Sequence, residues 1–150
     1  MPSIAGVSLL LVEDNALNAE IAETLLKDRG AKLTLAKDGQ EAVELFEKSR
    51  PGTFDGILMD VMMPVMDGLT ATKTIRALPR PDAAAIPIIA MTANAFQEDA
   101  QKCYDAGMNA HIGKPLEMDK VVTVISQFCE CKEDTKKHGP ILAGKREDKA

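Results

Sequence analysis

The fold is decided by residues 58–68, which read Leu58-Met59-Asp60-Val61-Met62-Met63-Pro64-Val65-Met66-Asp67-Gly68. The apolar residues 57–59 predict a buried strand, and this strand ends abruptly at the carboxylate of Asp60. Pro64 lacks the backbone N–H that a sheet needs, and Asp67-Gly68 is typical of a turn. Asp60 is therefore expected at the end of a buried strand, where a carboxylate is costly unless another group pairs with it.

Working outward, short apolar runs alternate with segments of helical periodicity. The runs predict strands at 8–12, 31–36, 54–60, 87–91 and 110–112, and the periodic segments predict helices at 16–29, 40–50, 68–78, 96–106 and 118–128. In the first helix, Leu17, Ile21 and Leu25 recur at four-residue spacing, with Ala22 and Leu26 alongside, and predict one apolar face. Five strands alternating with five helices predict an α/β protein with one parallel sheet and helices on both faces.

Length and charge exclude several classes of protein. The 150 residues suit one domain, and the net charge of −5 argues against a partner that is a nucleic acid. The sequence contains no apolar run long enough to cross a bilayer, and its start lacks the basic region of a signal peptide. Three cysteines without an export signal are typical of reduced thiols, so we expect a cytoplasmic chain without membrane contact.

Polar side chains follow four of the predicted strands. Glu13 and Asp14 follow the first, Asp60 the third, Thr92 the fourth and Lys114 the fifth. Because sites in open parallel sheets lie beyond the carboxyl ends of the strands, these groups should meet at one rim. Three carboxylates require a cation, and oxygen ligands favour Mg²⁺, Mn²⁺ or Ca²⁺ over zinc or copper. The lysine and the hydroxyl suit a phosphate, and a carboxylate can act as nucleophile and become an aspartyl phosphate.

The same motifs resemble a known family. Glu13-Asp14-Asn15, the stretch from Met59 to Gly68, Met91-Thr92-Ala93-Asn94-Ala95 and Lys114-Pro115 are similar to the receiver domain of two-component response regulators. The similarity is strongest to the receivers of hybrid histidine kinases and covers roughly residues 7–128. It implies a flavodoxin-like sheet with the strand order 2-1-3-4-5.

The resemblance also implies a role for each matching residue of the acceptor site. Asp60 would accept a phosphoryl group from a phosphohistidine. Asp14, Asp60 and the backbone carbonyl of Met62 would bind Mg²⁺ directly, and Glu13 would act through a metal-bound water. Mn²⁺ would also fit this set of ligands.

On the neighbouring strands, Thr92 and Lys114 would hold the phosphoryl oxygens. The Lys114-Pro115 peptide bond is typically cis in this family, an isomer that is tolerated before proline.

Two departures from the family pattern motivate hypotheses. His111 stands where the family usually has Tyr or Phe, so we expect His111 to act with Thr92 as the switch pair, with a pH-sensitive response. Met62 and Asn94 stand at the positions that tune water attack in the family. Neither carries a charge, which predicts slow autodephosphorylation.

The sequence therefore predicts a phosphoacceptor module of a phosphorelay rather than a stand-alone enzyme, either separate or as part of a hybrid histidine kinase. Its partners would be a histidine kinase or a histidine phosphotransfer protein, and a downstream partner on the face of the fourth helix, fifth strand and fifth helix. A Mg²⁺-dependent phosphohydrolase is disfavoured because Met62 supplies no second acid. A phosphorylation-independent interaction module is disfavoured by the complete set of Asp60, Thr92 and Lys114.

The ends of the chain are expected to lie outside the domain. We assign residues 1–6 to an N-terminal extension, 7–128 to the receiver domain and 129–150 to a charged C-terminal tail. A zinc site at Cys129, Cys131 and His138 is the alternative for this region, but it lacks a clear fourth ligand. Cys103, on the fourth helix, is expected to be a buried thiol.

Overall fold

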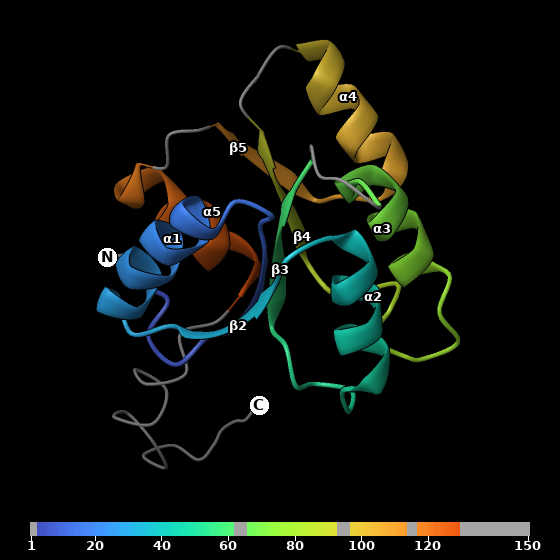
Figure 1. Ribbon diagram of the computed structural model, residues 1–150, viewed down its shortest axis with the longest axis horizontal. Helices are drawn as coiled ribbons and strands as arrows, with labels where there is room; N and C mark the ends of the chain where they lie inside the picture. The colour runs from blue at the N-terminus through green and yellow to red at the C-terminus, as the bar shows by residue number, and fades with distance from the viewer. Residues whose placement is uncertain (1–2, 62–65, 93–96, 114–116, 130–150) are drawn as a thin grey trace.

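The computed structural model describes residues 3–61, 66–92, 97–113 and 117–129, with the backbone alone for 97–100. Ten elements alternate along the chain (Figure 1). They are β1 (Ser8–Val12), α1 (Ala16–Asp28), β2 (Lys32–Ala36), α2 (Gly39–Lys48), β3 (Gly56–Asp60), α3 (Gly68–Arg76), β4 (Ile88–Thr92), α4 (Gln97–Ala106), β5 (Ala110–Gly113) and α5 (Met118–Phe128).

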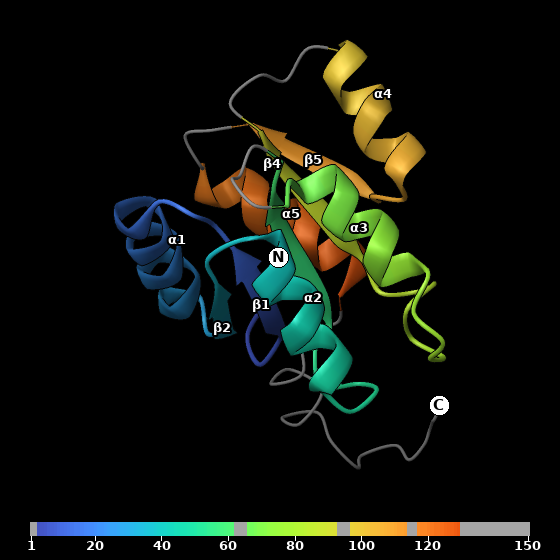
Figure 2. The same cartoon turned by 45° about the vertical axis from the view of Figure 1, so that its right-hand side comes forward.

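The strands form one parallel sheet in the order β2-β1-β3-β4-β5, which confirms the predicted topology. Helices α1 and α5 cover one face, and α2, α3 and α4 cover the other (Figures 1 and 2). Because all strands are parallel, their carboxyl ends lie along one rim of the sheet.

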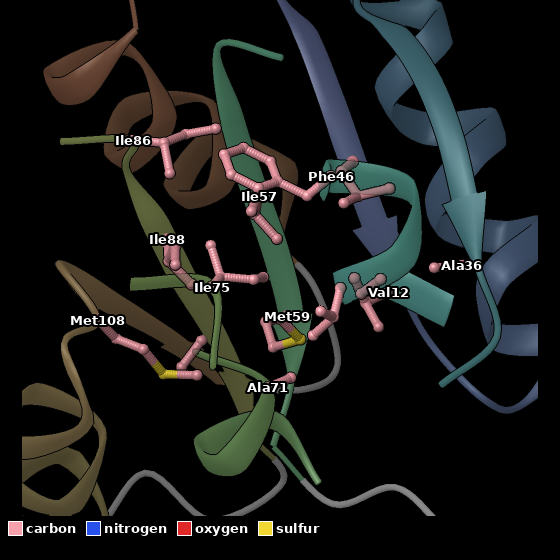
Figure 3. Close-up of a cluster of buried hydrophobic side chains, with 14 of the residues drawn as sticks. Val12, Ala36, Phe46, Ile57, Met59, Ala71, Ile75, Ile86, Ile88 and Met108 are labelled. Atoms are coloured by element: carbon pink, nitrogen blue, oxygen red, sulfur yellow. The ribbon is translucent and has the colours of Figure 1, made fainter. Parts of the chain in front are cut away.

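The sheet separates two hydrophobic clusters, one on each face. Successive residues of a strand point to opposite faces and so contribute to the two clusters in turn. Val12 and Met59 point towards α2 and α3 (Figure 3), whereas Leu11 and Leu58 point towards α1 and α5. All five residues of β3 and all five of β4 are buried. Burial on both faces explains why these strands read as unbroken apolar runs rather than as an alternating pattern.

Local sequence signals fix where several helices begin and end. The side chains of Asn15, Asp38 and Asp67 cap α1, α2 and α3 by accepting from backbone N–H groups three residues later. Helix α3 ends at Arg76, two residues before the predicted end, since Pro79 disfavours helical backbone at the residue before it. Strand β4 continues one residue further than predicted, because Thr92 still pairs with Gly113.

Helix α1 buries only part of its predicted apolar face. Ala22 and Leu26 are buried, whereas the side chains of Leu17 and Ile21 are 65% and 49% exposed. The predicted apolar face is therefore buried at Ala22 and Leu26 and exposed at Leu17 and Ile21. The helix packs beside the edge strand β2, so only the side with Ala22 and Leu26 reaches the core.

Candidate metal centre

Three carboxylates gather at the carboxyl rim of the sheet. Glu13 directly follows β1, Asp14 follows Glu13, and Asp60 is the last residue of β3. Strands β1 and β3 are neighbours in which Val12 pairs with Met59, so the next residues along, Glu13 and Asp60, emerge side by side. One carboxylate oxygen from each residue lies within 4.8 Å of those of the other two.

The backbone around this cluster is held by hydrogen bonds. The N–H of Glu13 donates to the carbonyl of Ala36 at 3.0 Å, which continues the pairing of β1 with β2. The Oε1 atom of Glu13 accepts from the N–H of Asn15 at 3.2 Å. Since Asn15 caps α1, the carboxylates of Glu13 and Asp14 lie beside the positive end of that helix, which favours negative charge.

The burial of the three side chains differs in a way that suits a cation. Glu13 and Asp60 are each 5% exposed, whereas Asp14 is exposed. Like charges this close repel, and hard cations with oxygen ligands relieve that repulsion. The exposed side at Asp14 leaves access for water or for a phosphate. The donor set therefore fits Mg²⁺ or Mn²⁺, and within the described residues it is the one group of this kind.

Thr92 lies at the same rim. It ends β4, is 7% exposed and follows Met91, which pairs with Asp60 across β3 and β4. The structure thus brings Thr92 to the strand end beside Asp60. Lys114, the residue directly after β5, lies outside the described residues. The same holds for the Lys114-Pro115 bond, Met62 and Asn94.

His111 lies on β5 opposite Ala90, on the face that α4 covers. Its Nδ1 atom is 3.1 Å from the hydroxyl of Tyr104 on α4, and the two rings meet edge to face with centroids 6.0 Å apart. Sequence reasoning missed Tyr104. It is the only tyrosine of the chain, but no spacing rule links a helix residue to a strand residue seven positions later.

The alternative of a zinc site at Cys129, Cys131 and His138 receives no support from the surroundings of Cys129. Cys129 is buried at the end of α5, and its thiol donates to the carbonyl of Asp55 at 3.2 Å. Cys131 and His138 lie outside the described residues. Cys103 is 1% exposed, which confirms the prediction of a buried thiol.

Comparison with known proteins identifies the class. The family model described as response regulator receiver domain matches residues 9–126, and the chain belongs to this family. Hybrid signal transduction histidine kinase I of Dictyostelium discoideum is 36% identical over 140 residues, covering 91% of this chain and 8% of that protein. The osmosensing histidine protein kinase SLN1 of Saccharomyces cerevisiae is 38% identical over 127 residues, covering 83% of this chain and 10% of that protein. The chain thus spans about a tenth of these relatives.

Solved structures show the same fold. The receiver domain of sensor histidine kinase PA1611 from Pseudomonas aeruginosa PAO1 is 41% identical with a TM-score of 0.74, covering 83% of this chain and 98% of that one. It holds a magnesium ion in its active site cleft. The receiver domain of the Saccharomyces cerevisiae response regulator Ssk1, in complex with the histidine phosphotransfer protein Ypd1, is 30% identical with a TM-score of 0.75, covering 84% and 90%.

Within the described residues, no helix is long and apolar enough to cross a bilayer.

Proposed function

We propose that this chain is a phosphoacceptor of a phosphorelay, which takes a phosphoryl group from a phosphohistidine onto Asp60. The observation that carries the proposal is the cluster of Glu13, Asp14 and Asp60 within 4.8 Å at the carboxyl rim of a receiver fold. A carboxylate oxygen of Asp60 would attack phosphorus, and the P–N bond would break with its electron pair returning to the imidazole.

Each residue has a part in this transfer. A bound Mg²⁺ would neutralise the negative charge of the carboxylates and of the incoming phosphoryl oxygens. Asp14 and Asp60 would hold the ion directly, and Glu13 through a water molecule. Thr92 would donate its hydroxyl to one phosphoryl oxygen, and Lys114 would add a positive charge. The magnesium ion in the related receiver of PA1611 supports this assignment.

The phosphoryl donor would be a histidine kinase or a histidine phosphotransfer protein. Such a donor must cover the rim to reach Asp60. Beside that rim, Leu17 and Ile21 expose apolar side chains on α1, which begins directly after the capping residue Asn15. We call Leu17 and Ile21 the α1 patch. An exposed apolar patch next to an acceptor suits a protein partner, and the complex of a related receiver with Ypd1 supports a phosphotransfer protein as that partner.

The output would be read on the face formed by α4, β5 and α5. Phosphorylation adds charge at the rim and would shift a two-state equilibrium in which Thr92 and His111 move together. The lack of charge at Met62 and Asn94 supports slow autodephosphorylation. We also propose a cytoplasmic location, which the cysteine usage of the sequence supports.

The direct test is the intact mass after incubation with acetyl phosphate and Mg²⁺, beside the Asp60→Asn variant. We expect one added phosphoryl group on the wild type alone, and none in EDTA. Equal labelling of Asp60→Asn would refute the acceptor assignment. Continuous turnover of a generic phosphate ester would favour the phosphohydrolase, and absence of labelling even by a phosphohistidine donor would favour the phosphorylation-independent module.

The partner is tested separately with a phosphorylated histidine phosphotransfer protein as donor. Leu17→Ser with Ile21→Ser should slow transfer from this protein about thirtyfold, since two buried apolar anchors at about 1 kcal/mol each contribute about 2 kcal/mol together. Thr24→Ala, an exposed position further along the same helix, is the matched control. If transfer from the protein donor is unchanged in the double variant, the α1 patch is not the docking surface.

A further inference from the structure

The turn between β2 and α2 contacts the segment that follows the acceptor. Gly39, the first residue of α2, donates its backbone N–H to the carbonyl of Met66 at 3.2 Å. Met66 directly precedes Asp67 and Gly68, where α3 begins. A helix that supplies none of the predicted site residues therefore touches the chain between Asp60 and α3.

The contact is too close for any side chain at position 39. A Cβ atom there would lie 2.3 Å from the oxygen of Met66 and 3.0 Å from the Cβ of Ala71. Gly39 is not among the glycines with positive φ, so space rather than backbone conformation excludes a larger residue. Helix propensity alone would favour Ala over Gly by up to about 1 kcal/mol. Close approach therefore explains this glycine better than the helix does.

The other end of the same segment reaches Asp60. The N–H of Gly68 donates to the carbonyl of Val61 at 3.0 Å, and a Cβ at position 68 would lie 2.3 Å from the carbonyl oxygen of Asp60. Val61 in turn donates its N–H to Met91 of β4 at 3.1 Å. Met66 is two residues from Gly68, so a displacement of Met66 would move Gly68, which has no room for a Cβ against the Asp60 carbonyl, and would shift the backbone that carries the Asp60 side chain.

We propose that Gly39 is a positioning residue for the acceptor site. Its N–H and its missing side chain fix Met66 and Gly68 against the end of β3, and so fix the geometry in which Asp60 shares a cation with Glu13 and Asp14. The proposal rests on the proposed function, which it extends to an element remote from the carboxylates. It requires that crowding at position 39 weakens cation binding although no ligand is changed.

The test compares the dissociation constant of Mg²⁺ in wild type, Gly39→Ala and Gln40→Ala, measured by amide NMR titration. We expect about tenfold weaker binding for Gly39→Ala, the scale on which residues that orient metal ligands act. Gln40→Ala, at the exposed neighbouring position, should bind like the wild type. The thermal midpoint without Mg²⁺ is measured alongside, because a purely structural role would lower it without changing the affinity of the folded protein. Wild-type affinity in Gly39→Ala would overturn the proposal.

A double variant separates the two crowded contacts. Ala71→Gly removes the neighbour on α3 but leaves the carbonyl of Met66 in place. Gly39→Ala with Ala71→Gly should therefore keep the weakened affinity. Recovery of wild-type affinity would show that the crowding acts through α3, and the proposal would be wrong.

Amide hydrogen exchange in the wild type needs no variant. It therefore tests the role of Gly39 even if Gly39→Ala does not fold. Mg²⁺ should slow exchange at the Gly39 N–H several-fold, since coupling between two sites is reciprocal. The Gly30 N–H, which donates to Lys27 at the far end of α1, is the reference. Equal responses at both amides would contradict the proposal. If the wild type binds Mg²⁺ but accepts no phosphoryl group, the proposed function fails while these comparisons still decide the role of Gly39.

Discussion

Asp14→Asn should stabilise the metal-free protein, because it removes one charge from three carboxylates whose oxygens lie within 4.8 Å. At that separation two like charges repel by about 0.9 kcal/mol in water and about 3.5 kcal/mol at an effective dielectric constant of 20. Asp14 is exposed, so the lower figure applies, and physiological salt reduces it by roughly half. Asp14 faces both Glu13 and Asp60. The positive end of α1 favours the Asp14 charge by about 0.5 kcal/mol, so we expect a net gain of about 0.5 kcal/mol in the free energy of unfolding.

Magnesium should reverse this order of stability. Loss of one carboxylate ligand is expected to weaken binding at least tenfold, which corresponds to about 1.4 kcal/mol. At a Mg²⁺ concentration about a hundred times the wild-type dissociation constant, the ion stabilises the wild type by about 2.7 kcal/mol and the variant by about 1.4 kcal/mol. The variant therefore loses its advantage, and the two proteins become nearly equal or change order.

The assay is urea unfolding followed by far-ultraviolet circular dichroism in EDTA and in MgCl₂, since the chain has no tryptophan to report by fluorescence. Glu20→Gln removes the same charge from an exposed position of α1 and is the matched control. It should change little in either buffer. The reasoning is refuted if Asp14→Asn is no more stable than the wild type in EDTA, or if Mg²⁺ stabilises both equally.

Three further predictions concern groups outside the metal centre. Arg76→Ala removes a guanidinium that donates to several backbone carbonyls, including that of Ile86 at 2.7 Å, and should cost about 3 kcal/mol in urea unfolding. The hydrogen bond from Arg80 lowers the pKa of Asp82. That pair therefore stabilises the fold above the ordinary carboxyl range and ceases to do so as pH falls through the lowered pKa. Asp82→Asn should cost up to about 1 kcal/mol at pH 7 and almost nothing in acid, as unfolding at both pH values will show. Tyr104→Phe removes the hydroxyl next to His111 and should enlarge the fraction of rings turned away from α4, measured by ring NMR shifts without phosphorylation.

The location of the carboxylates at one rim could be predicted from the order of strands and helices along the chain, whereas their closeness also depends on β1 and β3 being neighbours. A buried apolar run must end where a carboxylate interrupts it, and parallel strands bring their carboxyl ends to one rim. Asp60 and Thr92 each end a strand in which every residue is buried, so the end of each apolar run marks the position of the polar residue. The strand order could not be predicted in this way, since alternating elements do not determine which strands are neighbours. It came from the family resemblance alone.

The orientation of α1 and the role of Gly39 could not be predicted, because both depend on contacts between distant segments. Leu17 and Ile21 follow helical periodicity like buried residues, but the sheet ends at β2 and leaves that side of the helix without a core to pack against. Gly39 reads as an ordinary turn residue after Asp38, and only the position of the Met66 carbonyl shows why it must be small. Residues whose role depends on contacts with segments distant in the chain leave little signal in a single sequence.

The pairing of Tyr104 with His111 has a consequence for the direction of signalling. One hydrogen bond of this kind contributes about 1 kcal/mol, which favours the ring position beside α4 by about fivefold. If the ring turns towards Thr92 on phosphorylation, it must leave a partner that α4 itself carries. The position of the His111 ring and its contact with α4 then change together in one two-state equilibrium. A change in either one therefore shifts the other, because coupling is reciprocal. A protein that binds α4 and takes the hydroxyl of Tyr104 for itself would therefore favour the phosphorylated state, whereas one that presses α4 onto β5 would oppose phosphorylation at Asp60.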